Sequence, residues 1–157
     1  MARDDSPEAA FTRLVLLVFR LNGLLLYAGD RLTAPVGQTS ARWQVMGVID
    51  HEPLTVSAIA REMGLRRQSV QRTADLLAGD GVAEYVDNPA DRRARLLTLT
   101  PAGRRALRTI EQAQRAWAAE LGEGVGLEPL LQAEAALEKM VALLQESDYR
   151  TDSRRFA

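Results

Sequence analysis

The segment LTVSAIAREMGLRRQSVQRTADLLAG, residues 54–79, decides the fold of this chain because it predicts two short helices in tandem. Thr55 can cap the first helix with its side-chain oxygen, and Gly64 can end that helix in a left-handed conformation. The second helix is predicted from about Arg67 to Ala78. The residues that face the core at helical spacing are Val56, Ile59, Ala60 and Met63 in the first helix and Val70, Thr73, Ala74 and Leu77 in the second. Two short helices joined by a tight turn with a glycine predict a helix-turn-helix.

A hairpin is predicted directly after the second helix, where the apolar period changes from helical to alternating. The alternating runs are Val82–Val86 and Arg95–Leu99, and the eight residues between them, Asp87–Ala94, form a long tip. A further helix, with Ser40 as its cap, precedes the two short helices. The sequence therefore predicts a winged helix-turn-helix domain over residues 40–100.

The first predicted helix of the chain runs from Pro7 to about Asp30 and is apolar on most of its faces. Such a helix is typical of one that is buried between two subunits. A membrane span is not expected, because Arg13, Arg20 and Asn22 interrupt the apolar run and a span needs about 20 apolar residues. No cleavage-site pattern follows the helix, so a signal peptide is not expected either.

Two more helices are predicted after the hairpin. We expect the first of them to break at Gly122–Gly126 and the second to end near Gln145, followed by a loose polar tail from Ser147. The expected fold class is mainly α with a small β-hairpin wing. In this organisation the winged helix-turn-helix is flanked by dimerisation segments at residues 7–39 and 101–146.

The composition of the chain excludes several classes of function. The chain has 157 residues, one histidine and no cysteine, so a Cys–His pair, a disulfide framework and a thiol sensor are impossible in it. A histidine-rich metal site cannot form within one chain, and no Gly-rich phosphate loop is present. We therefore expect no enzyme, no cofactor and no metal, although carboxylates alone could hold an ion. The absence of cysteine fits a reducing compartment, and we expect a cytoplasmic protein.

Arginines gather around the helix-turn-helix and the hairpin tip, although the net charge of the chain is only −1. The outward face of the second helix carries Gln68, Gln71 and Arg72; arginine can pair with guanine O6 and N7, and glutamine can bridge adenine N6 and N7. Arginines at the hairpin tip suit a narrow minor groove. The predicted DNA-binding residues are Thr55, Arg66, Arg67, Gln68, Ser69, Gln71, Arg72, Asp91, Arg92, Arg93 and Arg95.

The order and spacing of these segments resemble the multiple antibiotic resistance regulator (MarR) family over about residues 40–103. The segments that carry the resemblance are Leu54–Ala60, Gly64-Leu65, Ser69–Arg72, Gly81-Val82, Asp91–Ala94 and Leu99–Gly103. The resemblance implies a homodimer that binds a palindromic operator in double-stranded DNA, with Asp91 and Arg93 as a pair in the wing. It also implies that the first helix and the last two helices form the dimer interface, and that repression is the usual outcome of binding.

One position departs from the pattern of that family. A small capping residue usually precedes the recognition helix, whereas Arg66 or Arg67 stands there in this chain. Arginine cannot accept the backbone N–H bonds that a cap accepts, and its charge is unfavourable at the positive end of a helix. The hypothesis that follows is that DNA phosphates stabilise these two arginines and that the turn is looser without DNA.

The resemblance also implies a response to small, often aromatic, anions that bind where the dimerisation helices meet the winged helix. The candidate residues for such a site are Asn22, Tyr27, Trp43, Met46 and His51. Trp43 and Met46 at helical spacing are more typical of a core than of a ligand site, and His51 is more typical of an exposed or capping residue at a helix end. The sequence therefore indicates candidates for an effector site but no particular ligand.

A second interpretation of the same residues is a winged-helix module that binds protein and has lost contact with DNA. A protein-binding helix exposes apolar anchors, and Leu76 is the only apolar residue near the outward face of the second helix. The arginines of the wing favour DNA instead. Binding to DNA that weakens steeply with salt would distinguish the two interpretations.

Overall fold

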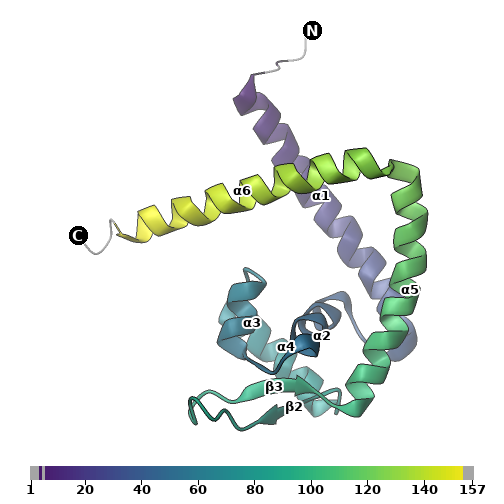
Figure 1. Ribbon diagram of the computed structural model, residues 1–157, viewed down its shortest axis with the longest axis vertical. Helices are drawn as coiled ribbons and strands as arrows, with labels where there is room; N and C mark the ends of the chain where they lie inside the picture. The colour runs from purple at the N-terminus through teal and green to yellow at the C-terminus, as the bar shows by residue number, and fades with distance from the viewer. Residues whose placement is uncertain (1–3, 5, 154–157) are drawn as a thin grey trace. The chain divides into compact units, whose positions relative to one another are not determined.

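The computed structural model describes residues 4 and 6–153 of the chain, which divides into two compact units, Met1–Ala113 and Gln114–Ala157. The elements in chain order are α1 (Pro7–Thr33), the 3-10 helix η1 (Ala34–Val36), α2 (Ser40–His51), β1 (Leu54–Thr55), α3 (Val56–Glu62), α4 (Arg67–Gly79), β2 (Ala83–Val86), β3 (Leu96–Leu99), α5 (Pro101–Val125) and α6 (Leu127–Ser153) (Figure 1). The helix-turn-helix is α3 and α4, and the hairpin is β2 and β3. The predicted mainly α fold with a small β wing is confirmed.

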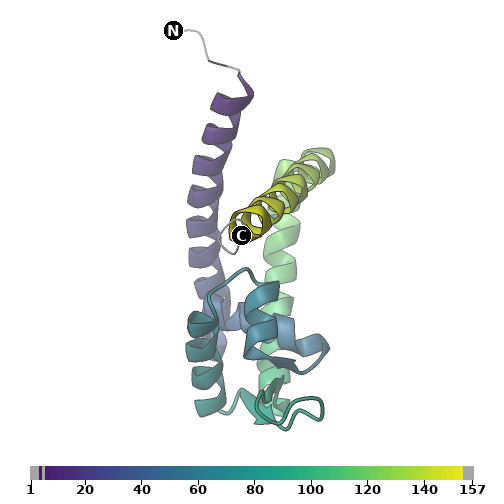
Figure 2. The same cartoon turned by 90° about the vertical axis from the view of Figure 1, so that its left-hand side faces the viewer.

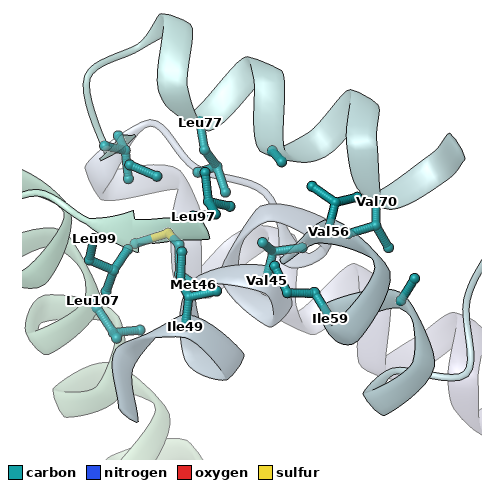
Figure 3. Close-up of a cluster of buried hydrophobic side chains, with 14 of the residues drawn as sticks. Val45, Met46, Ile49, Val56, Ile59, Val70, Leu77, Leu97, Leu99 and Leu107 are labelled. Carbon is teal, nitrogen blue, oxygen red and sulfur yellow. The ribbon is translucent and has the colours of Figure 1, made fainter. Parts of the chain in front are cut away.

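The hydrophobic core of the first unit lies among α2, α3, α4, the sheet and the first turns of α5 (Figure 3). Its fully buried large side chains include Met46, Ile49, Ile59, Leu77, Leu97, Leu99 and Ile110. The predicted inward faces of the two short helices are confirmed for their central residues, since Val70, Ala74 and Leu77 of α4 are all buried. Met63 and Thr73, at the margins of those faces, are half-buried. This core fixes α4 against the hairpin.

The sheet has three antiparallel strands in the order β1-β3-β2, one more than the hairpin that the sequence predicts. Leu54 pairs with Leu97, and Thr55 pairs with Leu96. Two residues are too short a run to show an alternating pattern, so this strand is visible only once the hairpin pairs with it. The consequence is that the start of α3 is tied to the base of the wing.

The caps of α2 and α3 show how local side chains start these helices. Thr55 accepts a hydrogen bond from Ala58 N at 3.2 Å, as expected. The predicted cap of α2 is wrong by one residue, because Thr39 accepts from Arg42 N at 3.3 Å. Ser40 is buried instead, and its N–H donates to the Asp30 carboxylate at 2.7 Å. Ser40 therefore joins α2 to the end of α1.

The C-terminal helices are longer than the sequence predicts. The break expected at Gly122–Gly126 is wrong for most of its length, because α5 continues to Val125 and only Gly126, with φ of 90°, leaves the helix. A glycine weakens a helix by about 1 kcal/mol but ends it only where its φ becomes positive. The loose tail expected from Ser147 is also wrong as far as Ser153, where α6 ends.

In Figures 1 and 2 the N-terminal part of α1 extends away from α2, α3 and α4, while its C-terminal end packs against α2. α1 also ends three residues later than expected, at Thr33. Its exposed large apolar side chains are Phe11, Leu16, Leu17, Phe19, Leu21, Leu24, Leu25, Leu26 and Tyr27. By length and composition alone, the segment Pro7–Val36 could cross a membrane, a test that core helices of soluble proteins and signal sequences also pass.

Candidate nucleic-acid interface

The outward face of α4 carries the polar residues that the sequence predicts there. Gln68, Ser69 and Arg72 are exposed, and Gln71 is half-buried. The opposite face is anchored in the core, so these side chains cannot turn inward without exposing apolar surface. The helix begins at Arg67, and the preceding N-cap residue, Arg66, has extended backbone and makes no side-chain capping bond, as the sequence predicts.

The tip of the wing is held in shape by side chains that bond to its own backbone. Asn88 Nδ2 donates to Ala94 O at 2.9 Å, and Asn88 Oδ1 accepts from Ala90 N at 3.0 Å. The Asp91 carboxylate accepts from Arg93 N at 2.9 Å. Asp91 therefore meets Arg93 through the backbone N–H, which leaves the guanidinium of Arg93 free to point out of the loop.

A cavity of about 300 Å³ lies between the start of α3, the start of α4 and the wing. Its lining residues are Thr55, Val56, Ser57, Arg67, Gln71, Tyr85, Arg93, Ala94 and Arg95. Three arginine side chains line it together with three hydroxyl-bearing side chains, those of Thr55, Ser57 and Tyr85, and no carboxylate lines the cavity. Such a lining has donors and positive charge but no acid, which suits an anionic oxygen ligand.

The arginines of this face lack acidic partners. Within residues 4 and 6–153, Arg66, Arg67, Arg72, Arg92 and Arg93 form no ion pair. The ion pair that the described side chains do form, Arg42 with Asp80 at 2.7 Å, lies at the other end of α4. Unpaired guanidinium groups on one face leave a positive potential that a phosphate backbone can neutralise.

Arg95 differs from the other wing arginines because it is held against β2. Its Nη2 donates to the carbonyl oxygen of Tyr85, and its guanidinium lies 5.6 Å from the centroid of the Tyr85 ring. A cation over an aromatic face is attracted by the ring quadrupole. Arg95 therefore lies against the base of the wing and lines the cavity, while Arg92 and Arg93 are exposed nearer the tip.

A closed hydrogen-bond triangle joins α4 to β2. Gln71 Nε2 donates to Asp75 Oδ1 at 2.8 Å and to Tyr85 Oη at 2.9 Å, and Tyr85 Oη donates to Asp75 Oδ1 at 2.8 Å. Burial, followed by the hydrogen bond and charge of Asp75, raises the pKa of Tyr85 to about 12. Tyr85 therefore stays protonated and remains a donor at neutral pH.

Sequence reasoning missed Asp75, Tyr85 and Ser57 as members of this site. Asp75 stands four residues after Gln71, so the two share one face of α4, and this spacing could have indicated their contact. Tyr85 lies on β2, and it reaches α4 only because the core packs β2 against that helix. Thr55 is predicted both as a cap and as a DNA ligand; its oxygen accepts the capping bond, and the residue also lines the cavity.

The candidate effector residues are dispersed in the first unit. Met46 is fully buried in the core, and Trp43 packs partly buried against it. Asn22, Tyr27 and His51 are exposed. Neither the cavity described above nor the shallow hollow on the outer face of α4 is lined by any of these five residues.

Comparison with known proteins gives a family for this architecture. The model of the MarR family matches residues 37–94. An uncharacterised protein of Mycobacterium tuberculosis is 39% identical over 133 residues, which are 85% of this chain and 93% of that protein. The transcriptional activatory protein BadR of Rhodopseudomonas palustris is 26% identical over 119 residues, 71% of this chain and 68% of its own.

Solved structures share the same fold. The M. tuberculosis transcriptional regulator MOSR in complex with DNA has a TM-score of 0.69 and 26% identity, over 83% of this chain and 96% of its own. CouR from Rhodococcus jostii, bound to p-coumaroyl-CoA, has a TM-score of 0.72 and 23% identity, over 81% of this chain and 90% of its own. The likeness to CouR concerns the fold alone.

Proposed function

This chain belongs to the MarR family of DNA-binding transcription regulators, and from that premise we propose that it is a homodimer that binds a palindromic operator. The family consists of DNA-binding regulators and not of enzymes. In the proposed complex, α4 enters the major groove and the β2–β3 wing reaches the neighbouring minor groove. Residues 40–100 form the DNA-binding part, and residues 7–39 and 101–146 form the dimerisation parts.

The observation that carries this proposal is the cavity lined by Arg67, Arg93 and Arg95. A phosphate group seated there would meet charge from α4 and from the wing at the same time, together with the hydroxyl groups of Thr55 and Ser57. Phosphate contacts fix the register of a protein on the duplex without reading its sequence. The cavity therefore supports a docking in which α4 and the wing follow one strand of the backbone.

The apolar surface of α1 supports a second copy of the chain as its cover. Phe19 is 69% exposed and Leu16 is 64% exposed, and seven more large apolar residues of this helix are exposed with them. A soluble monomer rarely leaves so large a continuous apolar surface in water. α6 adds further exposed apolar residues, including Leu127 and Val141. We place the protein in the cytoplasm, where its DNA lies.

The dimer is tested by sedimentation of the purified chain in detergent-free buffer. A dimer without detergent supports the proposal. A chain that stays in the membrane fraction and floats with phospholipid vesicles would instead show that α1 is inserted in lipid.

The regulatory part of the proposal is repression that a small aromatic or anionic effector relieves. A fold relative that carries p-coumaroyl-CoA supports this kind of ligand. Asn22, Tyr27, Trp43 and His51 are the candidate contacts, whereas the burial of Met46 fits a supporting role in the core. A reporter gene behind the operator tests the sign of regulation, since BadR is named as an activator.

DNA binding is tested by selecting bound duplexes from a random pool and measuring their affinity at rising salt. A palindrome with half-sites about one helical turn apart supports the dimer and its footprint. Arg93→Gln is expected to reduce the slope of log K against log salt by about 0.9 per contact, about 1.8 for two subunits. Arg115→Gln makes the same charge change outside the winged helix and is expected to leave the slope unchanged. Failure of the wild-type dimer to bind duplex at low salt would overturn the proposal in favour of a protein-binding module.

A further inference from the structure

Other side chains determine the orientation of the Gln71 amide on the outward face of α4. Two acceptors, Asp75 Oδ1 and Tyr85 Oη, lie 2.8 and 2.9 Å from Gln71 Nε2. An ionised carboxylate only accepts hydrogen bonds, so the N–H side of the amide must face Asp75. The acceptor at Asp75 therefore determines which of the two amide groups of Gln71, the NH2 or the oxygen, faces that residue.

The hydroxyl group of Tyr85 completes the hydrogen bonds that hold the Gln71 amide in one orientation. Its hydroxyl donates to Asp75 at 2.8 Å and accepts from Gln71, so both of its roles are filled. The amide nitrogen of Gln71 has two hydrogens, and two acceptors take them. Rotating the amide would break two hydrogen bonds and place its oxygen against a carboxylate, which is repulsive.

The side-chain oxygen of Gln71, Oε1, is the amide group that remains available to accept a hydrogen bond from a ligand. Gln71 Oε1 has no hydrogen-bond partner among the described residues, and Gln71 lines both the cationic cavity and the hollow on the outer face of α4. An amide with both groups free can bridge N6 and N7 of adenine, which requires one donor and one acceptor. Gln71 lacks the free donor for that contact.

We propose that Asp75 and Tyr85 are specificity-determining positioning residues, which hold Gln71 so that it reads an exocyclic amino group through Oε1 alone. The inference rests on the proposed function, since it needs α4 in the major groove. There the amino groups are N6 of adenine and N4 of cytosine, while guanine and thymine present acceptors. The position read by Gln71 therefore accepts adenine or cytosine and rejects guanine and thymine.

The inference is tested with operator duplexes selected by the wild-type protein, in which single bases are then replaced. Gln71→Ala first identifies the position, as the one where the preference of the wild type is lost. At that position the wild type is expected to bind adenine and cytosine within about threefold of each other, and guanine and thymine at least about fivefold more weakly. Replacing adenine by 7-deazaadenine, which lacks N7, is expected to leave wild-type affinity unchanged. Replacing it by purine, which lacks the amino group, is expected to weaken binding at least about fivefold.

The double variant Asp75→Ala, Tyr85→Phe releases the amide and supplies the matched comparison. It is expected to prefer adenine over cytosine by at least about fivefold, and to lose affinity with 7-deazaadenine. Its salt slope is expected to stay close to that of the wild type, because neither substitution removes an arginine from the cavity. The base-analogue series uses the wild-type protein alone. It therefore distinguishes reading through Oε1 from a bridging amide even if the double variant folds poorly.

Three results would overturn the inference. The first is equal loss of wild-type affinity with 7-deazaadenine and with purine, which indicates a bridging amide. The second is a double variant with the base preference of the wild type. The third is Gln71→Ala with no altered position, in which case Gln71 reads no base although DNA binding persists. Loss of all DNA binding by the wild type is a separate result, because it removes the proposed function itself.

Discussion

Replacing Gly103 by alanine is expected to destabilise the fold strongly, because α5 approaches the start of β2 too closely for a side chain. A Cβ atom at Gly103 would lie 2.0 Å from the carbonyl oxygen of Val82 and 3.2 Å from Cδ2 of Leu99. The obstacle is backbone, which cannot rotate away as a side-chain end can. The segments must separate by about 1 Å before this contact becomes tolerable, which is the kind of overpacking that costs 1–3 kcal/mol.

The Val82 carbonyl also carries hydrogen bonds that this separation would disturb. It accepts from Thr100 N at 3.1 Å and from Thr100 Oγ1 at 3.1 Å. Weakening one such bond costs about 1 kcal/mol. Together with about 2 kcal/mol of overpacking, the expected loss for Gly103→Ala is about 3 kcal/mol in the free energy of unfolding.

Urea denaturation at one fixed protein concentration measures this loss, because association of subunits makes the midpoint depend on concentration. With an m-value of about 2 kcal/mol/M, the midpoint is expected to fall by about 1.5 M. Gly47→Ala is the matched control, since a Cβ at Gly47 in α2 meets nothing within 4 Å. It is expected to gain up to about 1 kcal/mol from helix propensity. A Gly103→Ala protein as stable as the wild type, beside a stabilised Gly47→Ala, would refute the reasoning.

Three further changes probe other parts of the first unit. Thr55→Ala removes the oxygen that accepts from Ala58 N at the start of α3 and is expected to cost about 1 kcal/mol in urea denaturation, with Thr55→Ser restoring most of it. Arg66→Ser supplies the missing cap of α4 and is expected to stabilise the protein by about 1 kcal/mol while weakening DNA binding; an unchanged affinity would show that Arg66 makes no phosphate contact. Because the folded pKa of Tyr85 is raised to about 12 from an ordinary value of 10, the stability that depends on its neutral form is complete below pH 10 and is lost as the pH rises through 12. Ultraviolet absorbance should show a tyrosine that titrates near pH 12 in the wild type and is missing in Tyr85→Phe; no such step in the wild type would contradict the assignment.

Features that depend on neighbouring residues could be predicted from the sequence. The inward faces of α3 and α4 follow from apolar spacing, and the cap at Thr55 follows from a side chain that reaches its own helix. The missing cap at Arg66 is also a local property, because arginine has no acceptor wherever it stands. The break near Gly122–Gly126 was predicted less well, since glycine permits a break without requiring it and only Gly126 takes a positive φ.

Features that join distant segments were decided by the tertiary structure. The pairing of Leu54 with Leu97 makes a third strand from two residues that carry no pattern of their own. The orientation of Gln71 depends on Tyr85, which lies fourteen residues further along the chain and reaches α4 only because the core packs the hairpin against it. The sequence alone determined that α4 presents glutamine and arginine outward, because helical periodicity is local. Which hydrogen-bonding group the glutamine presents depended on packing between a helix and a strand, and no local pattern encodes such a contact.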